Sequence, residues 1–277
     1  MKRVKALVLT GYGLNCDYET DYALSVAGAD SQRVHINELI KAERVDHQPL
    51  LAGFHILVFG GGFSWADDHG AGVLLANRVR YNIGSQIDQF IADGKIVIGI
   101  CNGFQALVNL GLLPGFDGDY HSRQVALTVN DCGNFRDQWV TLKVLPSSCT
   151  WLRDLKQIDL PVRHGEGKFF ADDQVLDRLF SQGQVVFQYA GPDGGLADGV
   201  FPHNPNGSLR DIAGICDTTG RVLGMMPHPE AFNHVTNHPD WTRLKETLRR
   251  SGQPLREEGL GVQIFRNAVT YIGETVL

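Results

Sequence analysis

Three short apolar runs, each ending abruptly in a glycine-containing turn, constrain the fold most. They cover Val4–Thr10, His55–Phe59 and Lys95–Ile100. Each run is rich in Val, Ile or Leu without strict alternation, which is typical of parallel strands buried on both faces. Stretches with helical spacing of apolar residues lie between them, at Asp17–Ala27 and Gly72–Ala92. Alternation of strands with helices predicts an α/β fold with a parallel sheet.

The second half of the sequence indicates strands of a different kind. Three stretches alternate in polarity or are rich in β-forming residues, which suggests antiparallel strands added to the same sheet; they lie at 124–129, 138–144 and 184–189. Ala190–Ser208 contains five glycines and three prolines and is predicted to be a surface loop. The chain is predicted to close with a strand pair at 211–216 and 222–226 and with helices at 240–250 and 261–273. No internal repeat divides the sequence, which favours one domain.

Composition and charge argue against several classes of function. The formal net charge of −6 argues against a nucleic-acid partner, because phosphate contacts need clustered Lys and Arg. No apolar run reaches the length of about 18 residues that a membrane span needs. The apolar start ends at Gly11 without a signal-peptide cleavage pattern, so we expect a buried strand there. The five scattered cysteines include no Cys-x-x-Cys pair, which predicts neither a disulfide framework nor a zinc site and favours a reducing cytoplasm.

The sharpest chemical signal is Cys101, in the sequence GICNGFQ. It follows an apolar strand, has glycine two positions away on either side, and precedes a helix predicted from Gln105 to Leu113. This pattern is typical of a nucleophile elbow with sulfur in place of oxygen. A helix N-terminus lowers the pKa of a thiol placed there, and the backbone N–H of Asn102 would face a developing oxyanion. A buried cysteine that only fills the core is the alternative interpretation.

A second signal is the sequence MMPHPE, at residues 225–230. His228 and Glu230 follow an apolar strand and lie two residues apart, so the carboxylate can hold one imidazole nitrogen while the other faces a thiol. A similar run at His238-Pro239-Asp240 lies in a polar stretch, and we therefore favour His228. With Cys101 these residues form the set expected for acyl transfer at an amide.

The glycine run of GGGFS, at 60–64, also ends a strand. The spacing of a phosphate-binding loop is absent and no lysine follows, so we predict instead that Gly62 N–H is a second oxyanion donor. Two further sequences, PVRHGEG at 161–167 and NPNGS at 204–208, are predicted from composition alone to be polar loops or turns.

Taken together, these sequences resemble the class I glutamine amidotransferases, and among them the glutaminase components of phosphoribosylformylglycinamidine synthases. GGFSWAD, GICNGFQALVNLGLLPG, PVRHGEGKF, NPNGS and LGMMPHPEAF occur in that family's order over most of the chain. HGEG and NGS are much more specific than Cys plus HPE, which other class I members share. The resemblance implies a three-layer, flavodoxin-like α/β fold, mainly parallel with added antiparallel strands, in a single domain over residues 1–277.

The resemblance also implies an activity. Cys101 would be the nucleophile that attacks the amide of L-glutamine, His228 the general base and then acid, and Glu230 the carboxylate that orients it. The released ammonia would supply the ATP-dependent conversion of formylglycinamide ribonucleotide to formylglycinamidine ribonucleotide in purine biosynthesis. ATP and magnesium would be used by a large synthetase subunit, aided by a small accessory subunit, so this chain is expected to carry no cofactor or metal.

Three further residues match positions near the family's glutamine site. Gln105 matches a glutamine that helps to hold the substrate, and His164 and Glu166 match a loop near the site. The chain departs from the family's pattern at Gly60, where proline is common, and at Gly70, where arginine is common. A glutaminase for another synthase, an inactive regulatory subunit with this fold, and a cysteine peptidase or esterase remain as alternatives.

Overall fold

The computed structural model describes residues 3–47 and 49–277. Within these residues the main sheet has nine strands in the order β2-β1-β3-β4-β11-β10-β9-β6-β7. The first five strands in this order run parallel to one another. Their bounds are β1 Lys5–Thr10, β2 Asp30–His35, β3 Ile56–Phe59, β4 Ile96–Ile100 and β11 Val222–Met225. The three apolar runs that predicted a parallel sheet are therefore confirmed as β1, β3 and β4.

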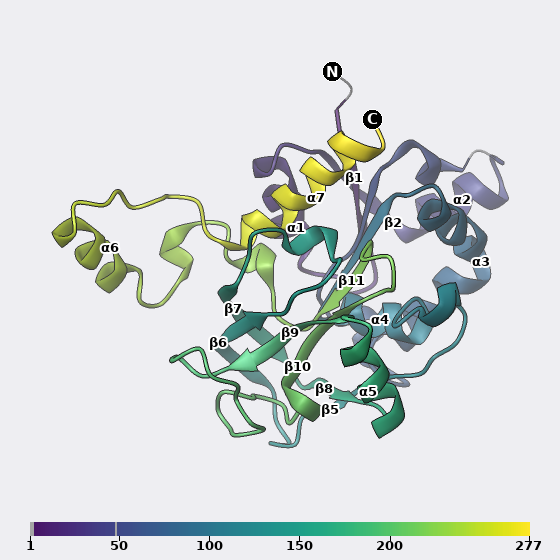
Figure 1. Cartoon of the computed structure of the whole chain (residues 1–277). Coiled ribbons are helices and arrows are strands. Elements are labelled where there is room, and N and C mark those ends of the chain that lie inside the picture. Colours follow the sequence, from purple (N-terminus) through teal and green to yellow (C-terminus); the bar gives the residue numbers. More distant parts are fainter. Residues whose placement is uncertain (1–2, 48) are drawn as a thin grey trace.

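Helices cover both faces of the parallel half and make three layers, with strands in the 2-1-3-4-5 order of flavodoxin-like folds. One face is covered by α1 (Asp17–Val26) and α7 (Gly261–Thr275), which contact each other. The other face is covered by α2 (Ile36–Arg44), α3 (Val73–Ala92) and α4 (Asn102–Leu110), as Figure 1 shows. Every residue of β3 and β4 is buried, as expected for strands enclosed by two helical layers.

The other half of the sheet is antiparallel. The predicted closing pair is confirmed, since β10 and β11 are antiparallel with Ile215 opposite Gly224. β11 also pairs in parallel with β4, where Met225 lies opposite Ile100, and so joins the two halves. The remaining strands are β6 Arg136–Val144, β7 Gln157–His164, β9 Val185–Ala190 and β10 Ile212–Cys216.

Two predictions about the second half are wrong. The strand predicted at 124–129 forms as β5 (Ala126–Val129), but it pairs with β8 (Glu166–Phe170) in a separate two-stranded sheet. Residues 161–167 are not a polar loop, because they form the end of β7 and the start of β8. Their pairing partners, β6 for β7 and β5 for β8, are determined by the tertiary structure, which composition does not reveal. The sequence reasoning also left β2, α2 and α5 (Asp173–Ser181) unassigned and began α4 three residues too late.

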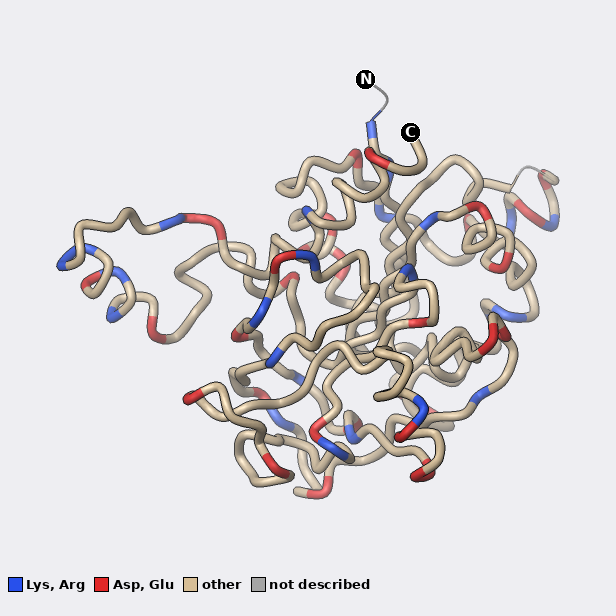
Figure 2. Tube along the Cα trace, in the orientation of Figure 1, with Lys and Arg blue, Asp and Glu red and all other residues tan. Residues whose placement is uncertain are grey.

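An arm between Phe232 and Gly261 extends from the body of the molecule and carries α6 (Trp241–Arg250), at the left of Figure 1. Its base is closed by backbone hydrogen bonds from Val235 to Glu257 and from Gly259 to Asn233. Basic and acidic residues are interspersed along the trace rather than gathered in one region (Figure 2). Among the described residues, no helix combines the length and apolar character needed to cross a membrane.

The packing of α4 on β3 generates a prediction. A methyl group on Gly103 would overlap the carbonyl oxygen of Phe59, whereas one on Gly273 in α7 would meet nothing within 4 Å. We expect Gly103→Ala to lower the free energy of unfolding by about 1–3 kcal/mol or more, because the obstacle is backbone. Gly273→Ala is the matched control and should be neutral or stabilising by up to about 1 kcal/mol. Urea denaturation followed by circular dichroism measures both, and equal stabilities for the two variants would contradict the prediction.

Candidate active site

The segments that carry the predicted site residues meet at one edge of the parallel sheet. Cys101 follows β4, the GGGFS loop follows β3 and His228 follows β11, each at the carboxyl end of its strand. Ligands of open parallel sheets bind in the crevice outside this edge. The N–H of Cys101 donates to the carbonyl of Met225 over 2.8 Å, so the two strand ends are held side by side.

Cys101 stands at a sharp strand-to-helix turn. Its φ of 51° and ψ of −108° lie outside the region that non-glycine residues favour, and its side chain is buried. The turn depends on its two flanking glycines. A methyl group on Gly99 would lie 2.6 Å from the carbonyl oxygen of Gly103, and one on Gly103 would overlap Phe59. The predicted nucleophile elbow is therefore present in geometry, and the Sγ atom lies 3.6 Å from the carbonyl oxygen of Arg163.

His228 and Glu230 form a buried pair. Nδ1 of His228 lies 2.6 Å from Oε1 of Glu230, and their side chains are 2% and 0% exposed. Nε2 of His228 has no hydrogen-bond partner among the described residues. Burial lowers the pKa of His228, but the charge of Glu230 and the nearby Cys101 thiol outweigh it and hold the pKa well above its usual range. Nδ1 of His228 therefore contacts a carboxylate, and Nε2 is available to the Cys101 thiol.

Cys16, which the sequence gave no reason to single out, lies against the same imidazole. Its thiol, His228 and Glu230 place ligand atoms within 4.8 Å of one another. Burial is the main reason that the pKa of Cys16 is raised. These donor types suit a divalent metal. However, the 2.6 Å contact within the His228–Glu230 pair leaves no room for an ion unless the pair separates.

The GGGFS loop brings backbone amides to the site. A methyl group on Gly61 would lie 2.7 Å from Cε1 of His228, so only glycine allows this approach. Gly62, at a φ of 147°, donates its N–H to no acceptor among the described residues. Asn102 is the first residue of α4, so its N–H has no acceptor within the helix. Neither predicted oxyanion donor therefore has an acceptor within the part of the chain that the structure describes.

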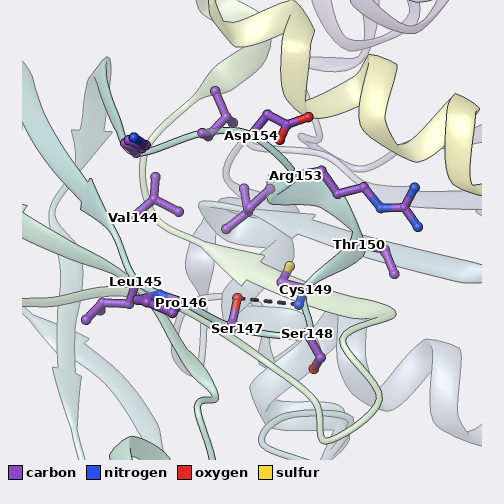
Figure 3. Close-up of a pocket in the computed structure, with 12 residues that line it drawn as sticks. Val144, Leu145, Pro146, Ser147, Ser148, Cys149, Thr150, Arg153 and Asp154 are labelled. Carbon is purple, nitrogen blue, oxygen red and sulfur yellow. Dashed lines mark hydrogen bonds between the residues drawn. The ribbon is translucent and has the colours of Figure 1, made fainter.

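A hollow of about 170 Å³ opens beside His228. Its wall includes the Cys16 thiol, Gly62 and aromatic rings from two loops, at Phe63 and Phe135. A larger hollow of about 390 Å³ lies in the connection from β6 to β7, lined by residues between 144 and 156 (Figure 3). None of the predicted site residues lines the larger hollow. We therefore assign the candidate active site to the smaller one.

Comparison with known proteins agrees with this geometry. A family model for a CobB/CobQ-like glutamine amidotransferase domain matches residues 3–272. The chain is 40% identical over 272 residues to the phosphoribosylformylglycinamidine synthase subunit PurQ of Methanococcus maripaludis strain S2, with 98% of each chain covered. It is 44% identical over 273 residues to the subunit of the same name from Dehalococcoides mccartyi strain 195, again with 98% of each chain covered.

This chain belongs to the PurQ-like glutamine amidotransferases. A solved structure described as PurLQS from Thermotoga maritima shares the fold, with a TM-score of 0.69 and 24% identity over 98% of this chain and 100% of that one. The family and the flavodoxin-like fold that the sequence resemblance implied are both confirmed, and the chain is an enzyme of the glutamine amidotransferase class.

Gln105, His164 and Glu166 are the remaining predicted site residues of this amidotransferase. Gln105 is buried, and its Nε2 donates to the carbonyl of Glu166 while its Oε1 accepts from Asn102 over 3.0 Å. His164 is 2% exposed, and its Nε2 accepts from Nδ2 of Asn206 over 3.0 Å. His164 therefore ties the NPNGS loop to the strand end. Substrate contact by Gln105, His164 or Glu166 stays a prediction, and the burial of His164 does not favour contact through its ring.

The buried ring of His164 generates a pH prediction. Burial, and then the charge of His228, lowers the pKa of His164 from 6.5 to about 3. Between these two pKa values, His164 binds a proton in the unfolded chain but not in the folded protein. This site should therefore reduce stability by about 1.4 kcal/mol per pH unit as the pH falls from 6.5 toward 3. We expect His164→Gln to remove this slope in urea titrations, relative to the exposed control His121→Gln. The same slope in both variants would contradict the assignment.

Proposed function

We propose that this chain hydrolyses L-glutamine with Cys101, His228 and Glu230 and supplies ammonia for the synthesis of formylglycinamidine ribonucleotide. The observation that carries the proposal is the buried His228–Glu230 pair at 2.6 Å, beside a cysteine at a strained strand-to-helix turn. Support for the pathway comes from relatives named as phosphoribosylformylglycinamidine synthase subunits, which match this chain over nearly its whole length.

The reaction begins when the sulfur of Cys101, whose proton is held on Nε2 of His228, attacks the side-chain amide carbon of glutamine. The carbonyl oxygen becomes an oxyanion, to which the N–H groups of Gly62 and Asn102 donate. The carbon–nitrogen bond then breaks, His228 returns its proton to the leaving nitrogen, and ammonia departs. A γ-glutamyl thioester remains on Cys101. Water, with His228 as base, attacks the thioester and forms a second oxyanion. The carbon–sulfur bond then breaks, glutamate is released, and the proton taken from water stays on the Cys101–His228 pair.

The ammonia is of use only if a partner consumes it, because it is protonated and lost to water near neutral pH. We propose docking to a synthetase large subunit that uses ATP and magnesium, with a small accessory subunit. The structure from Thermotoga maritima, described as PurLQS, is consistent with such an assembly for that protein. We place the reaction in the cytoplasm, where free thiols such as the five of this chain stay reduced.

Removal of the nucleophile gives the first test of the function. We expect Cys101→Ala to lower ammonia release from glutamine by at least about 10⁴-fold, because the thioester no longer forms. Cys149→Ala is the matched control, since this buried thiol lines the other hollow. Ammonia release is measured for the purified chain alone and with the synthetase, its ribonucleotide substrate and ATP.

The outcomes of that assay separate the parts of the proposal. Activity that needs Cys101 and rises with the synthetase supports both the chemistry and the pathway. Activity that needs Cys101 but ignores the synthetase would keep the glutaminase and contradict the pathway. No ammonia from any mixture would favour an inactive regulatory subunit.

The charge of Glu230 generates a second test. The pKa of His228 is raised chiefly by this carboxylate, which works against burial. Glu230→Gln should therefore lower that pKa and move the alkaline limb of the kcat/KM profile to lower pH, with a loss of about 100-fold or more at the optimum. Glu246→Gln, on the exposed helix α6, is the control. An alkaline limb that does not move would show that Glu230 does not set the protonation of His228.

A further inference from the structure

The side chain of Asn102 makes contacts that its predicted role as a backbone donor does not require. The residue directly follows Cys101 and is 0% exposed. Its Oδ1 accepts a hydrogen bond from the N–H of Ser64 over 3.2 Å. Its Nδ2 donates to Oδ1 of Asp67 over 2.9 Å and to Oε1 of Gln105 over 3.0 Å. Every donor and acceptor type of this carboxamide is therefore engaged.

These bonds cross between the two segments that carry the predicted oxyanion donors. One donor, Gly62 N–H, lies in the loop after β3, and the other, Asn102 N–H, lies in the turn after β4. The pairing of β3 with β4 ends where Phe59 lies opposite Gly99, before either donor is reached. The bond from Ser64 to Asn102 continues the connection two residues beyond Gly62. It therefore links the loop to the residue that holds the second donor.

Asp67 determines which way the carboxamide faces. Burial raises the pKa of Asp67 to about 6, and above that pH its carboxylate only accepts hydrogen bonds. It therefore requires Nδ2 of Asn102 on its side and leaves Oδ1 for the Ser64 N–H. Gln105 strengthens this choice, because its own Nε2 donates to the carbonyl of Glu166 and so presents Oε1 to Asn102. Rotation of the Asn102 amide by half a turn would place its oxygen against two acceptors.

The loop needs such a restraint because its backbone is strained. Trp65, Ala66 and Asp67 have φ values of 53°, 57° and 57°, a left-handed run that non-glycine residues rarely adopt. On its outer side the loop is held by the turn after β1, through bonds from Phe63 N–H to Gly13 and from Trp65 N–H to Tyr12. On its inner side, the Asn102 carboxamide holds it next to the nucleophile. Strain of this kind persists where the surroundings over-determine the conformation.

We propose that the carboxamide of Asn102, oriented by Asp67, is a positioning group that sets the distance between the two oxyanion donors. The inference rests on the glutaminase proposed above. The position of a donor relative to the oxyanion matters more for the transition state than for bound glutamine, which carries no full charge on that oxygen. Loss of the carboxamide should therefore affect kcat much more than KM.

Asn102→Ala is the test, with Asn109→Ala as the matched control. Asn109 lies on the same helix and donates to the carbonyl of Ala71 over 3.1 Å, outside the predicted machinery. We expect Asn102→Ala to lower kcat by roughly 10- to 100-fold, the order expected for a misplaced reacting geometry, with KM changed by less than about threefold. The control should retain kcat within about twofold. Circular dichroism and thermal unfolding show whether each variant is folded.

A second measurement separates donor placement from damage to the nucleophile. An analogue of glutamine with an aldehyde in place of the carboxamide accepts the Cys101 sulfur at its carbonyl carbon, and the former carbonyl oxygen takes the place of the oxyanion. Iodoacetamide alkylates the same sulfur with loss of iodide and forms no oxyanion. We expect Asn102→Ala to weaken the aldehyde by about the same factor as kcat and to leave the alkylation rate within about twofold.

The outcomes are distinct. A wild-type chain that releases no ammonia in any mixture would overturn the proposed function and this inference with it. An active wild type with unchanged kcat in Asn102→Ala, or equal losses in aldehyde binding and alkylation, would overturn the positioning role alone. If Asn102→Ala does not fold, Asp67→Ala decides the question, because Asp67 is only partly buried. It should show the same pattern with a smaller loss, and unchanged kcat in Asp67→Ala would count against the proposal.

Discussion

The parallel pairing of β4 with β11 is the interaction on which the site depends. The two strands come from distant parts of the chain, yet their ladder continues to the bond between Cys101 N–H and the Met225 carbonyl, at 2.8 Å. The cysteine elbow and the histidine turn therefore leave the same edge of the sheet as neighbours. Because both strands are completely buried, their register is fixed by packing, and a shift of one residue would exchange the side chains that pack on the two faces of the sheet.

The burial of the His228–Glu230 pair makes the charge of each group depend on the groups that contact it. A carboxylate at 0% exposure is costly unless it is paired, and Glu230 is paired only through Oε1, since Oε2 has no partner among the described residues. The positive charge of protonated His228 offsets part of that cost. The same attraction keeps the pKa of His228 high in spite of burial. The large apolar sheet that surrounds the pair supplies the stability that the site itself does not.

Sequence reasoning located the residues whose position follows from local pattern. Cys101 and His228 each end an apolar strand beside glycine or proline, and strand ends of a parallel sheet share one edge, so their meeting could be predicted. The partner of β5 could not, because alternation reveals a strand without naming its neighbour. Residues 161–167 were misjudged for a related reason. His164 looks like a loop residue until its bond to Asn206 is known. The contact of Cys16 with His228 likewise has no local signal.

Asparagine carboxamides join segments around the site at several positions where the backbones do not pair as strands. Asn130 donates to the carbonyl of His164 over 2.8 Å and accepts from the N–H of Gly167 over 3.0 Å, while Asn206 donates to the carbonyl of Gly167 over 2.9 Å. Asn102 does the same between the GGGFS loop and the elbow. A neutral amide both donates and accepts, so it satisfies two backbone groups without burying a charge. These neutral carboxamides therefore make the walls of the site rigid without adding charge. The electrostatics of the site are determined by Glu230, His228 and Cys101.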